Sequence, residues 1–370
     1  MNNPKQEQEL TLIDMTTALV MAGGRSERMR RSNGPTIKPL VSVAGVPLLE
    51  RNLQALIRSR IEDIHVVIPA QGEPELKEWV YSRAVRLIRA AGARLEIHEE
   101  TIPRGNIGGC GDLHGKARNL LVVFADNLTT LDLRALLRDH DQGGAALTLA
   151  VHEEPFRMSF GEVRTDGDQV TGYWEKPDKN FLISSGVSVL GAPALALLAN
   201  QGQQPVGLSD LYRLVAGRGL KVRAFRHQAA WIDVNDGAAA IRAEKLVAEN
   251  RADFDHWFEQ GAPQPVRERV LHVISGADGV LLSRRDGRWL LPAWSAAEDD
   301  GSWREMGSFD DLDEAAGAIF RHRVLSRAYP GGLAPDTNEA PVWVDGDALA
   351  SIRKAEPSID RVLSFVGAVS

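Results

Sequence analysis

Residues 18–53 read ALVMAGGRSERMRRSNGPTIKPLVSVAGVPLLERNL, and this stretch decides the expected fold. An apolar run ends in Gly23 and Gly24, and cationic side chains follow, among them Arg28 and Lys38. Glycines after a buried strand let backbone N–H groups approach a ligand and form an anion-binding concavity. Arginine and lysine add contacts to phosphates. The stretch predicts a strand that leads into a phosphate site. An ordinary strand-to-helix turn with solvated arginines is the alternative interpretation.

Two common nucleotide motifs are excluded. The G-x-G-x-x-G spacing of dinucleotide-binding folds is missing, and no Gly-Lys-Ser/Thr ends the segment as a P-loop would require. The combination of the glycine pair with Lys38-Pro39-Leu40 is the distinctive feature.

Strand-like and helix-like segments alternate after this point. Continuous apolar runs of the kind found in parallel sheets are separated by segments with helical spacing. This alternation predicts an α/β fold with a mostly parallel, mixed sheet. The strand-like runs are 17–22, 63–70, 94–100, 119–125 and 145–152.

The chain length favours two domains. Residues 1–17 are a polar arm, and residues 18–260 form the predicted α/β domain. A Gly-Ala-Pro-Gln-Pro break at 261–265 is the expected boundary, and residues 266–370 form a smaller C-terminal α+β domain.

Composition narrows the classes of function. The net charge of −7 gives no electrostatic footprint for nucleic acid or an anionic membrane. Cys110 is the only cysteine, which excludes an intramolecular disulfide and a multi-cysteine metal site. No apolar run approaches the roughly 20 residues of a membrane span. We therefore expect a soluble cytoplasmic protein; a homo-oligomer is compatible with the sequence, which leaves the oligomeric state open.

Five segments in order resemble the sugar-1-phosphate nucleotidyltransferases, also called NDP-sugar pyrophosphorylases. They are the opening AGG…R…KPL signature, VVFADN at 122–127, GEVRTDGDQVTGYWEKP at 161–177, FLISSGVSVL at 181–190 and WIDVND at 231–236. The resemblance covers about residues 18–249. It implies a Rossmann-like three-layer α/β/α domain that joins an NTP to a sugar 1-phosphate and releases pyrophosphate.

The resemblance also assigns roles at the nucleotide. Arg28 and Lys38 would contact the triphosphate, and Asp126 and Asp233 would bind Mg²⁺. Magnesium takes oxygen ligands and bridges substrate phosphates. The acceptor phosphate is already largely ionised near neutral pH, so no general base is required. Backbone contacts to the nucleotide are implied for Ala22, Gly23, Gly24, Gly105 and Gly108.

For the acceptor, the resemblance implies that Lys176 contacts the sugar phosphate and that Glu175 accepts a hydrogen bond from a hydroxyl group of the sugar ring. Gly161, Ser185 and Gly186 would lie close to the sugar. Alone, Glu175 and Lys176 would be a solvated pair at a strand end. Cys110 is expected to be a packing residue, and His65, His98 and His227 are expected to be structural.

Departures from the family pattern concern the substrates more than the reaction. Glu27 places negative charge beside the triphosphate segment, Ile37 replaces the usual proline before Lys38, and Ser184 stands where asparagine is common. These changes favour a modified sugar or a cyclitol phosphate as acceptor. Among the nucleotides, GTP is slightly favoured.

The C-terminal part is harder to interpret. Residues 279–294 faintly resemble the opening strands of Nudix-type domains, and residues 311–326 have helical spacing. The Glu-Glu pair of a Nudix box is missing, so we expect an accessory, non-catalytic domain.

Two other functions compete with sugar-nucleotide synthesis. One is a catalytically weak regulator that binds a nucleotide or sugar nucleotide. The other is a nucleotidyltransferase that acts on a non-sugar alcohol phosphate. An active enzyme is favoured over the regulator, because the residues expected to bind the metal and the phosphates are present, namely Asp126, Asp233, Arg28, Lys38 and Lys176.

Overall fold

A computed structural model describes most of the chain. The described residues are 12–13, 15–23, 37–257, 267–276, 279–285, 288–291, 303–328, 342–344 and 346–366. Gly24, Glu27, Arg28, most of the 1–17 arm and the 261–265 break lie outside them. The domain boundaries therefore stay a prediction.

The largest sheet has seven strands in the order β12-β8-β11-β6-β1-β4-β5. β12 runs parallel to β8, and β5 runs parallel to β4, whereas β11 is antiparallel to both of its neighbours. The sheet is mixed, as the alternation of strands and helices predicted. All six residues of β1 (Thr16–Met21) are buried, so the apolar run before the glycine pair is a central strand.

The chain divides into two compact units. The first comprises Met1–Leu19, Ile102–Phe124 and Leu131–Trp231, and the second comprises Val20–Thr101, Ala125–Thr130 and Ile232–Ser370.

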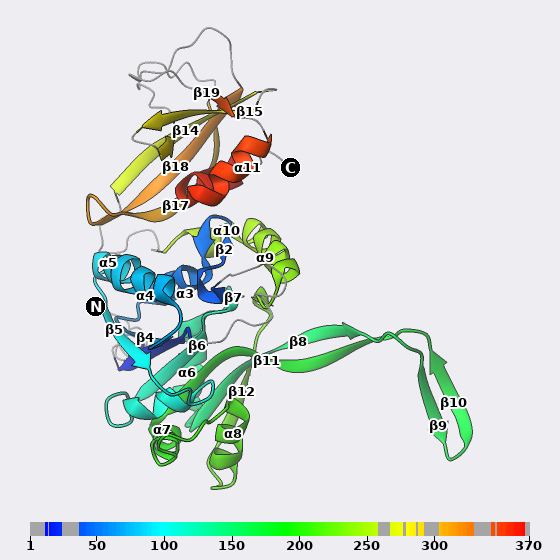
Figure 1. Cartoon of the computed structure of the whole chain (residues 1–370). Coiled ribbons are helices and arrows are strands. Elements are labelled where there is room, and N and C mark those ends of the chain that lie inside the picture. Colours follow the sequence, from blue (N-terminus) through cyan, green and yellow to red (C-terminus); the bar gives the residue numbers. More distant parts are fainter. Residues whose placement is uncertain are drawn as a thin grey trace, which may run out of the picture. The chain divides into compact units, whose positions relative to one another are not determined.

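In the first unit, long antiparallel strands carry short helices (Figure 1). α7 packs on the 3-10 turn η3, on α8 and on β11, and α6 contacts β8, β11 and β12. The strands are β6 (Asn119–Phe124), β8 (Leu147–Arg157), β11 (Asp178–Gly191) and β12 (Val222–Arg226), and the helical elements are η3 (Gly108–Leu113), α6 (Leu133–Gly143), α7 (Ala192–Ala199) and α8 (Leu208–Ala216).

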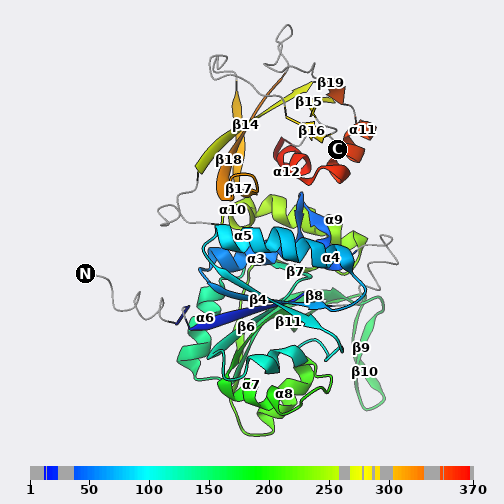
Figure 2. The ribbon, with the colours of Figure 1, turned by 60° about the vertical axis from the view of Figure 1, so that its left-hand side comes forward.

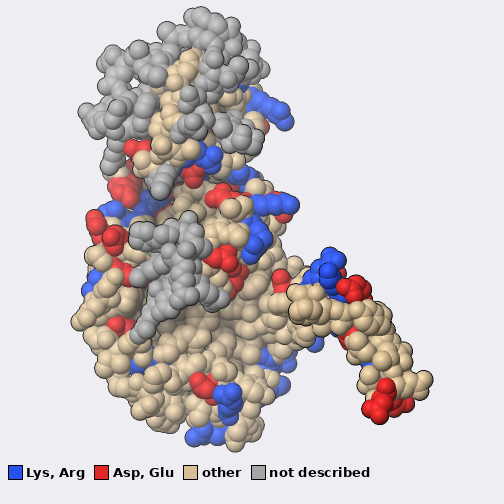
Figure 3. All heavy atoms as spheres, turned by 45° about the vertical axis from the view of Figure 1, so that its right-hand side comes forward, with Lys and Arg blue, Asp and Glu red and all other residues tan. Residues whose placement is uncertain are grey.

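The far ends of β8 and β11 form an extended arm that carries the hairpin β9 (Glu162–Asp166) and β10 (Gln169–Trp174) (Figure 1). The expected turn at residues 166–168 is present, with Gly167 in the left-handed region at φ +56°. Charged side chains gather at the bend and at the tip of this arm, and the surface between them is mostly uncharged (Figure 3). Large apolar side chains are exposed on it, namely Phe156, Met158, Phe160, Val163, Val170, Tyr173, Trp174, Phe181 and Leu182.

In the second unit, a helical layer covers one face of β4 (Asp63–Pro69) and β5 (Arg94–Glu100) (Figure 2). Amphipathic spacing gives α3 its buried leucines Leu48, Leu49, Leu53 and Leu56. The layer consists of α3 (Leu48–Arg58), α4 (Pro74–Trp79), the π-turn η2 (Val80–Ala84) and α5 (Val85–Ala90). Shorter elements complete this part, namely η1 (Lys38–Leu40), β2 (Ser42–Val43), β3 (Val46–Pro47), β7 (Asn127–Thr129), β13 (Trp231–Asp233), α9 (Gly237–Glu249) and α10 (Arg251–Asp255).

Residues 267–366 form a second sheet with its own core. The order is β16-β15-β14-β18-β17, and β19 pairs with β15. Val273, Val280, Phe309, Val324 and Leu363 are among its buried residues. The elements are β14 (Arg267–Gly276), β15 (Gly279–Arg285), β16 (Arg288–Leu290), β17 (Arg304–Asp313), β18 (Ala318–Ala328), β19 (Val342–Val344), α11 (Gly346–Ala355) and α12 (Pro357–Val366).

The helix expected over residues 311–326 is wrong. These residues form the end of β17, a turn and most of β18. Gly317 lies in the left-handed region at φ +58°, which ends a helix and suits a hairpin turn. Beyond it, His322, Val324 and Ser326 are buried at alternate positions, which is the period of a strand. The described residues therefore contain no helix at the place of a Nudix box.

A buried charge network lies beneath α3. The carboxylate of Asp255, 2% exposed, faces three guanidinium groups at ion-pair distance. Its Oδ1 lies 3.7 Å from Arg51 and 3.8 Å from Arg361, and its Oδ2 lies 3.5 Å from Arg251. Burial lowers the pKa of Arg51 to about 10, and Asp255 opposes this shift. One carboxylate thus serves cations from α3, α10 and α12.

The network predicts a large effect on stability. Replacing Asp255 with alanine leaves three cations facing one another with little solvent. We expect the free energy of unfolding to fall by about 3–5 kcal/mol, measured by urea denaturation. The matched control is Asp253→Ala, because Asp253 lies on the same helix and is exposed. The control is expected to lose less than about 1 kcal/mol, and equal losses would contradict the role of the network.

No helix in the described part of the chain is both long and apolar enough to cross a membrane.

Candidate active site

Lys38, Asp126 and Asp233, to which the family resemblance assigns the phosphates and the metal, lie close together in the second unit. The Lys38 Nζ lies 2.6 Å from Asp126 Oδ2 and 3.8 Å from Asp233 Oδ1. It also donates to the side-chain oxygen of Asn235. The Lys38 side chain is 14% exposed, whereas the two carboxylates are about one-third exposed. The ammonium therefore sits inside the cluster, and the acidic groups remain open to solvent.

Backbone and side-chain bonds hold the two aspartates in place. Asp126 precedes β7, which pairs with β13, the strand that ends at Asp233. The N–H of Val234 donates to the carbonyl of Asp126 at 2.9 Å. On the other side, buried Asn52 donates its amide to the carbonyls of Ala125 and Asn127. These bonds fix the backbone on both sides of Asp126.

The donor set suits a divalent cation. Two carboxylates repel each other unless a positive charge lies between them, and here the Lys38 ammonium has that position. The amide of Asn235 donates to Asp233 and offers its oxygen to the same ammonium. Carboxylate and amide oxygens are the ligands that hard cations such as Mg²⁺ prefer. The residues present therefore fit a magnesium ion held by Asp126 and Asp233.

The structure describes two of the other residues expected at the nucleotide next to β1. Ala22 and Gly23 follow β1; Ala22 is buried and donates its N–H to Val67, while Gly23 is exposed. Gly24 and Arg28 lie outside the described residues. Whether Gly23 contacts a nucleotide stays a prediction.

In the first unit, Gly105 and Gly108 pack against their own loop and its neighbour. Gly105 has φ +81°, and a Cβ there would lie 2.3 Å from the carbonyl oxygen of Val206. A Cβ at Gly108 would lie 2.7 Å from the Cβ of Arg104. Cys110 in the same loop is buried, as expected for a packing residue. Close packing therefore requires these glycines independently of any ligand.

Glu175 and Lys176 lie in the arm, between β10 and β11. Both are exposed, and Glu175 accepts a hydrogen bond from Tyr173 at 2.9 Å. Lys176 has φ +44°, a left-handed conformation that is uncommon for a lysine. A Cβ on Gly161 would lie 2.3 Å from the Tyr173 oxygen, so Gly161 makes room for that ring.

Ser185 belongs to a polar chain that the sequence did not reveal. Its Oγ lies 2.8 Å from His152 Nδ1 and 2.7 Å from His227 Nε2. A hydroxyl can donate to one imidazole and accept from the other. Glu154 extends the chain, 3.3 Å from His152 Nε2, and Trp231 donates its indole N–H to the Ser185 carbonyl at 2.8 Å. His227, which was expected to be structural, is bonded to Ser185 and also lines a cavity.

The cavity has a volume of about 700 Å³ and mixed polar and aromatic walls. It is lined by His152, Glu153, Glu154, Leu182, Arg226, His227, Gln228, Ala229 and Trp231. Burial, together with the neighbouring His152, lowers the pKa of His227, so this imidazole is neutral near pH 7. Gly186 follows Ser185 at φ +71°, where β11 changes register against β8. The local bulge brings Ser185 behind His152 and His227, which line the cavity.

Sequence reasoning missed Asn235, His152 and His227 as site residues. Asn235 had a usable signal, because it lies two residues after Asp233, and alternate residues of an extended segment share a face. The histidines had none, since β8 and β12 are far apart in sequence and pair only in the folded sheet.

Comparison with known proteins adds the family. The family model described as nucleotidyl transferase matches residues 17–250. The chain belongs to the nucleotidyl transferase family. The match includes Lys38, Asp126 and Asp233, and the second sheet at residues 267–366 lies outside it.

Relatives with printed activities differ in nucleotide and acceptor. The chain is 31% identical over 164 residues to a mannose-1-phosphate guanylyltransferase of Mycobacterium tuberculosis, which covers 44% of each chain. It is 22% identical to a glucose-1-phosphate cytidylyltransferase of Salmonella typhi, over 65% of this chain and 99% of the relative. It is 27% identical to a bifunctional IPC transferase and DIPP synthase of Rubrobacter xylanophilus, over 68% and 55%. The chain spans less than half the length of the first two curated relatives that it matches.

A solved structure confirms the fold of the family domain. A crystal structure described as a "Putative Glucose-1-Phosphate Thymidylyltransferase" from Bacillus anthracis aligns with a TM-score of 0.50 at 17% identity, over 62% of this chain and 94% of that chain. This likeness supports the predicted α/β nucleotidyltransferase fold alone.

The loop glycines give a test of packing. Gly105 and Gly115 both have positive φ, +81° and +77°, but only Gly105 has neighbours where a Cβ would lie. We expect Gly115→Ala to lower the free energy of unfolding by about 1–2 kcal/mol, the cost of the conformation alone. Gly105→Ala is expected to cost about 1–3 kcal/mol more, from the clash with Val206. Urea denaturation measures both, and equal losses would show that the loop shifts to admit the methyl group.

Proposed function

We propose that this protein transfers a nucleotidyl group from an NTP to a sugar 1-phosphate or a related cyclitol phosphate. The product is an NDP-sugar or its cyclitol analogue, and pyrophosphate is released. The observation that carries the proposal is the convergence of Asp126, Asp233 and Asn235 on the Lys38 ammonium. The relatives named as guanylyl- and cytidylyltransferases acting on sugar 1-phosphates support it.

The chemistry needs charge neutralisation more than proton transfer. An oxygen of the acceptor phosphate attacks the α-phosphorus, and a new P–O bond forms. The bond from the α-phosphorus to the bridging oxygen breaks, and that oxygen leaves with pyrophosphate. Because the acceptor oxygen is already largely ionised, positioning and positive charge supply the catalysis.

Asp126 and Asp233 would hold Mg²⁺, and Lys38 would contact phosphate oxygens. A bound magnesium ion would neutralise charge on the triphosphate. The Lys38 ammonium balances the charge of the two carboxylates. A metal ion bound to them would take over this role, and Lys38 could then contact the phosphates. Arg28, on the pyrophosphate side, and Lys176, on the acceptor phosphate, keep their proposed roles.

The cavity lined by His152, His227 and Trp231 is the proposed acceptor pocket. A sugar or cyclitol presents several hydroxyl groups, and the lining offers both acceptors and donors for them. Glu153 and Glu154 accept and Arg226 donates, whereas His227, whose two nitrogens already bond to Ser185 and to the N–H of Ala229, contributes its ring to the wall. Trp231, which lines the pocket, precedes Asp233 by two residues, so one strand contributes to both sites.

The nucleotide and the acceptor are proposed at a finer level. GTP is the first nucleotide to test, because the relative with 31% identity is a guanylyltransferase. CTP is the second, on the strength of the cytidylyltransferase relative. The acceptor panel is glucose, mannose and inositol 1-phosphates, and an activity confined to glucose 1-phosphate would contradict the preference for a modified sugar or cyclitol.

If Asp126 binds the catalytic metal ion, removing its charge should lower the activity. In Asp126→Asn the carboxylate that lies nearest Lys38 becomes neutral, and one metal ligand is weakened. We expect kcat for pyrophosphate release with Mg²⁺ to fall about 100- to 1,000-fold. The control is Asp132→Asn, because Asp132 caps α6 through the N–H of Ala135, asparagine caps equally well, and the ion pair with Arg138 that is lost is solvent-exposed. Unchanged activity in Asp126→Asn would refute the assigned site.

If the cavity binds the acceptor, a change in its lining should alter KM for the acceptor and leave KM for the NTP unchanged. Replacing His227 with glutamine removes the imidazole and keeps a polar group that can reach Ser185. We expect KM for the acceptor to rise about tenfold, equal to about 1.4 kcal/mol, because the imidazole forms part of the pocket wall, while KM for the NTP stays the same. His114→Gln is the control, because His114 is exposed and outside the pocket lining. A rise in KM for the NTP alone would place the nucleotide in this cavity instead.

A further inference from the structure

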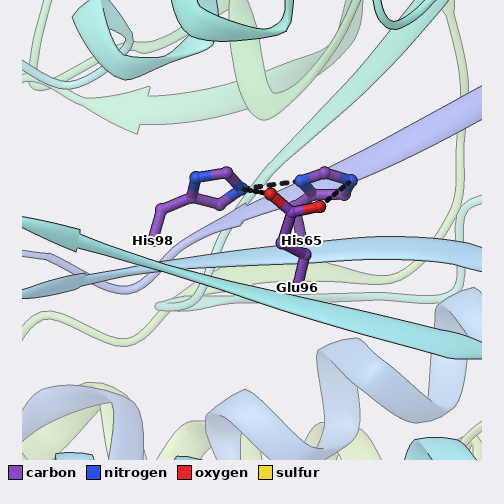
Figure 4. Close-up of side chains that lie close together, drawn as sticks. All are labelled: His65, Glu96 and His98. Atoms are coloured by element: carbon purple, nitrogen blue, oxygen red, sulfur yellow. Dashed lines mark hydrogen bonds and ion pairs between the residues drawn. The ribbon is translucent and has the colours of Figure 1, made fainter.

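Two histidines and a glutamate meet on one face of the β4–β5 pair. His65 on β4 lies directly opposite Glu96 on β5, and His98 is two residues further along β5. Alternate residues of a strand point to the same face, so all three side chains project together. Figure 4 shows the two imidazoles and the carboxylate turned toward one another. The cluster lies apart from Lys38, Asp126 and Asp233 in the chain, and the proposed reaction does not use it.

The donor atoms are close enough to share one ligand. His65 Nδ1 lies 2.7 Å from His98 Nε2, with the two rings nearly coplanar at 13°. Glu96 Oε1 lies 3.7 Å from His98 Nε2. One ligand atom from each of the three residues lies within 4.8 Å of the others. Two imidazole nitrogens and a carboxylate oxygen form a common donor set for Zn²⁺.

A carboxylate behind His65 orients the ring. The Nε2 of His65 makes no hydrogen bond, but it lies 3.3 Å from Asp63 Oδ1. Asp63 is itself paired with Arg94 at 2.6 Å. Asp63 and Glu96, whose Oε2 lies 4.0 Å away, both favour a proton on this far nitrogen, and in that tautomer the lone pair of Nδ1 faces His98. Metal-binding histidines commonly have such a partner.

Burial differs across the cluster in a way that suits an ion entering from solvent. The His65 side chain is 4% exposed, so its position is fixed by packing. His98 and Glu96 are 26% and 49% exposed, so they can adjust. A tetrahedral zinc ion needs its two nitrogens about 3.3 Å apart. The half-buried His98 ring therefore has to move away by at least about half an ångström, and both rings have to turn so that their lone pairs converge on the ion.

We propose that His65 Nδ1, His98 Nε2 and the Glu96 carboxylate bind one divalent transition-metal ion, with Zn²⁺ the best fit, and that the ion links β4 to β5. The site differs in chemistry from the cation cluster at Asp126. Imidazole nitrogen favours transition metals, whereas a set of oxygen donors favours Mg²⁺. Excess Mg²⁺ can therefore saturate the oxygen site and leave the histidine site available.

The test is a titration of the full chain with Co²⁺ after treatment with a chelator and in excess Mg²⁺. Cobalt bound to nitrogen and oxygen in a tetrahedral site has visible absorption bands that hydrated cobalt lacks. We expect the bands to saturate at about one equivalent and to disappear when Zn²⁺ is added. No saturable band in the unmodified chain would overturn the proposal and leave the pair as a proton-sharing contact.

Variants assign the ligands. His98→Gln and Glu96→Gln change exposed side chains, so they leave the fold intact, which circular dichroism verifies. Each is expected to raise the dissociation constant for Co²⁺ at least about tenfold, and Asp63→Asn about 10- to 100-fold through His65. His114→Gln, an exposed histidine elsewhere, is expected to bind cobalt unchanged. Identical cobalt binding by all variants would refute the assigned ligands. Cobalt absorption does not depend on pyrophosphate release, so this test is independent of the proposed function.

Discussion

The mutual repulsion of Asp126 and Asp233 is the constraint around which the candidate site is built. Two carboxylates near one another raise the free energy of the folded chain unless a cation lies between them. Lys38 supplies that cation, 2.6 Å from one carboxylate and 3.8 Å from the other. The same arrangement gives the site its chemistry, because a group of oxygen donors with a movable ammonium can exchange its own cation for a metal ion.

A second group of charges connects this region to the C-terminal sheet. The turn after β2 has Gly45 at φ +74°, and its missing Cβ leaves space for the backbone of Arg361 on α12. Arg361 then faces Asp255, as does Arg51 of α3. Helix α3 and the turn that follows Lys38 are thus packed against residues outside the family match. This contact gives the C-terminal sheet a structural role next to the nucleotidyl transferase domain.

Histidines in this protein show how the same residue type serves different environments. His152 and His227 share one serine hydroxyl at the rim of a cavity, where burial keeps His227 neutral. His65 and His98 face each other through two ring nitrogens 2.7 Å apart, with carboxylates on either side. The nitrogens of the first pair are bonded to Ser185, Glu154 and Ala229, so this pair shapes the wall of the cavity. The second pair has the charge environment of a cation site.

The sequence by itself determined the α/β class, the buried strand at 17–22 and the ordered motifs that contain Lys38, Asp126 and Asp233. Buried strands, amphipathic helices and glycine turns are local patterns, so their positions follow from composition and period. The interpretation of 311–326 as a helix failed because its charged residues matched a helical period, while the turn at Gly317 and pairing with β17 favoured strands.

Only the tertiary structure decided which polar side chains meet. Asn235 contacts Lys38, Ser185 contacts two histidines, and His65 contacts His98. In each case the partners are far apart in the sequence and meet only after the strands or loops that carry them have come together. Gly105 and Gly108 were expected at the nucleotide, yet packing against Val206 and Arg104 already requires them. The physical reason is that burial and hydrogen bonding depend on distances between elements, and strand order and register set those distances.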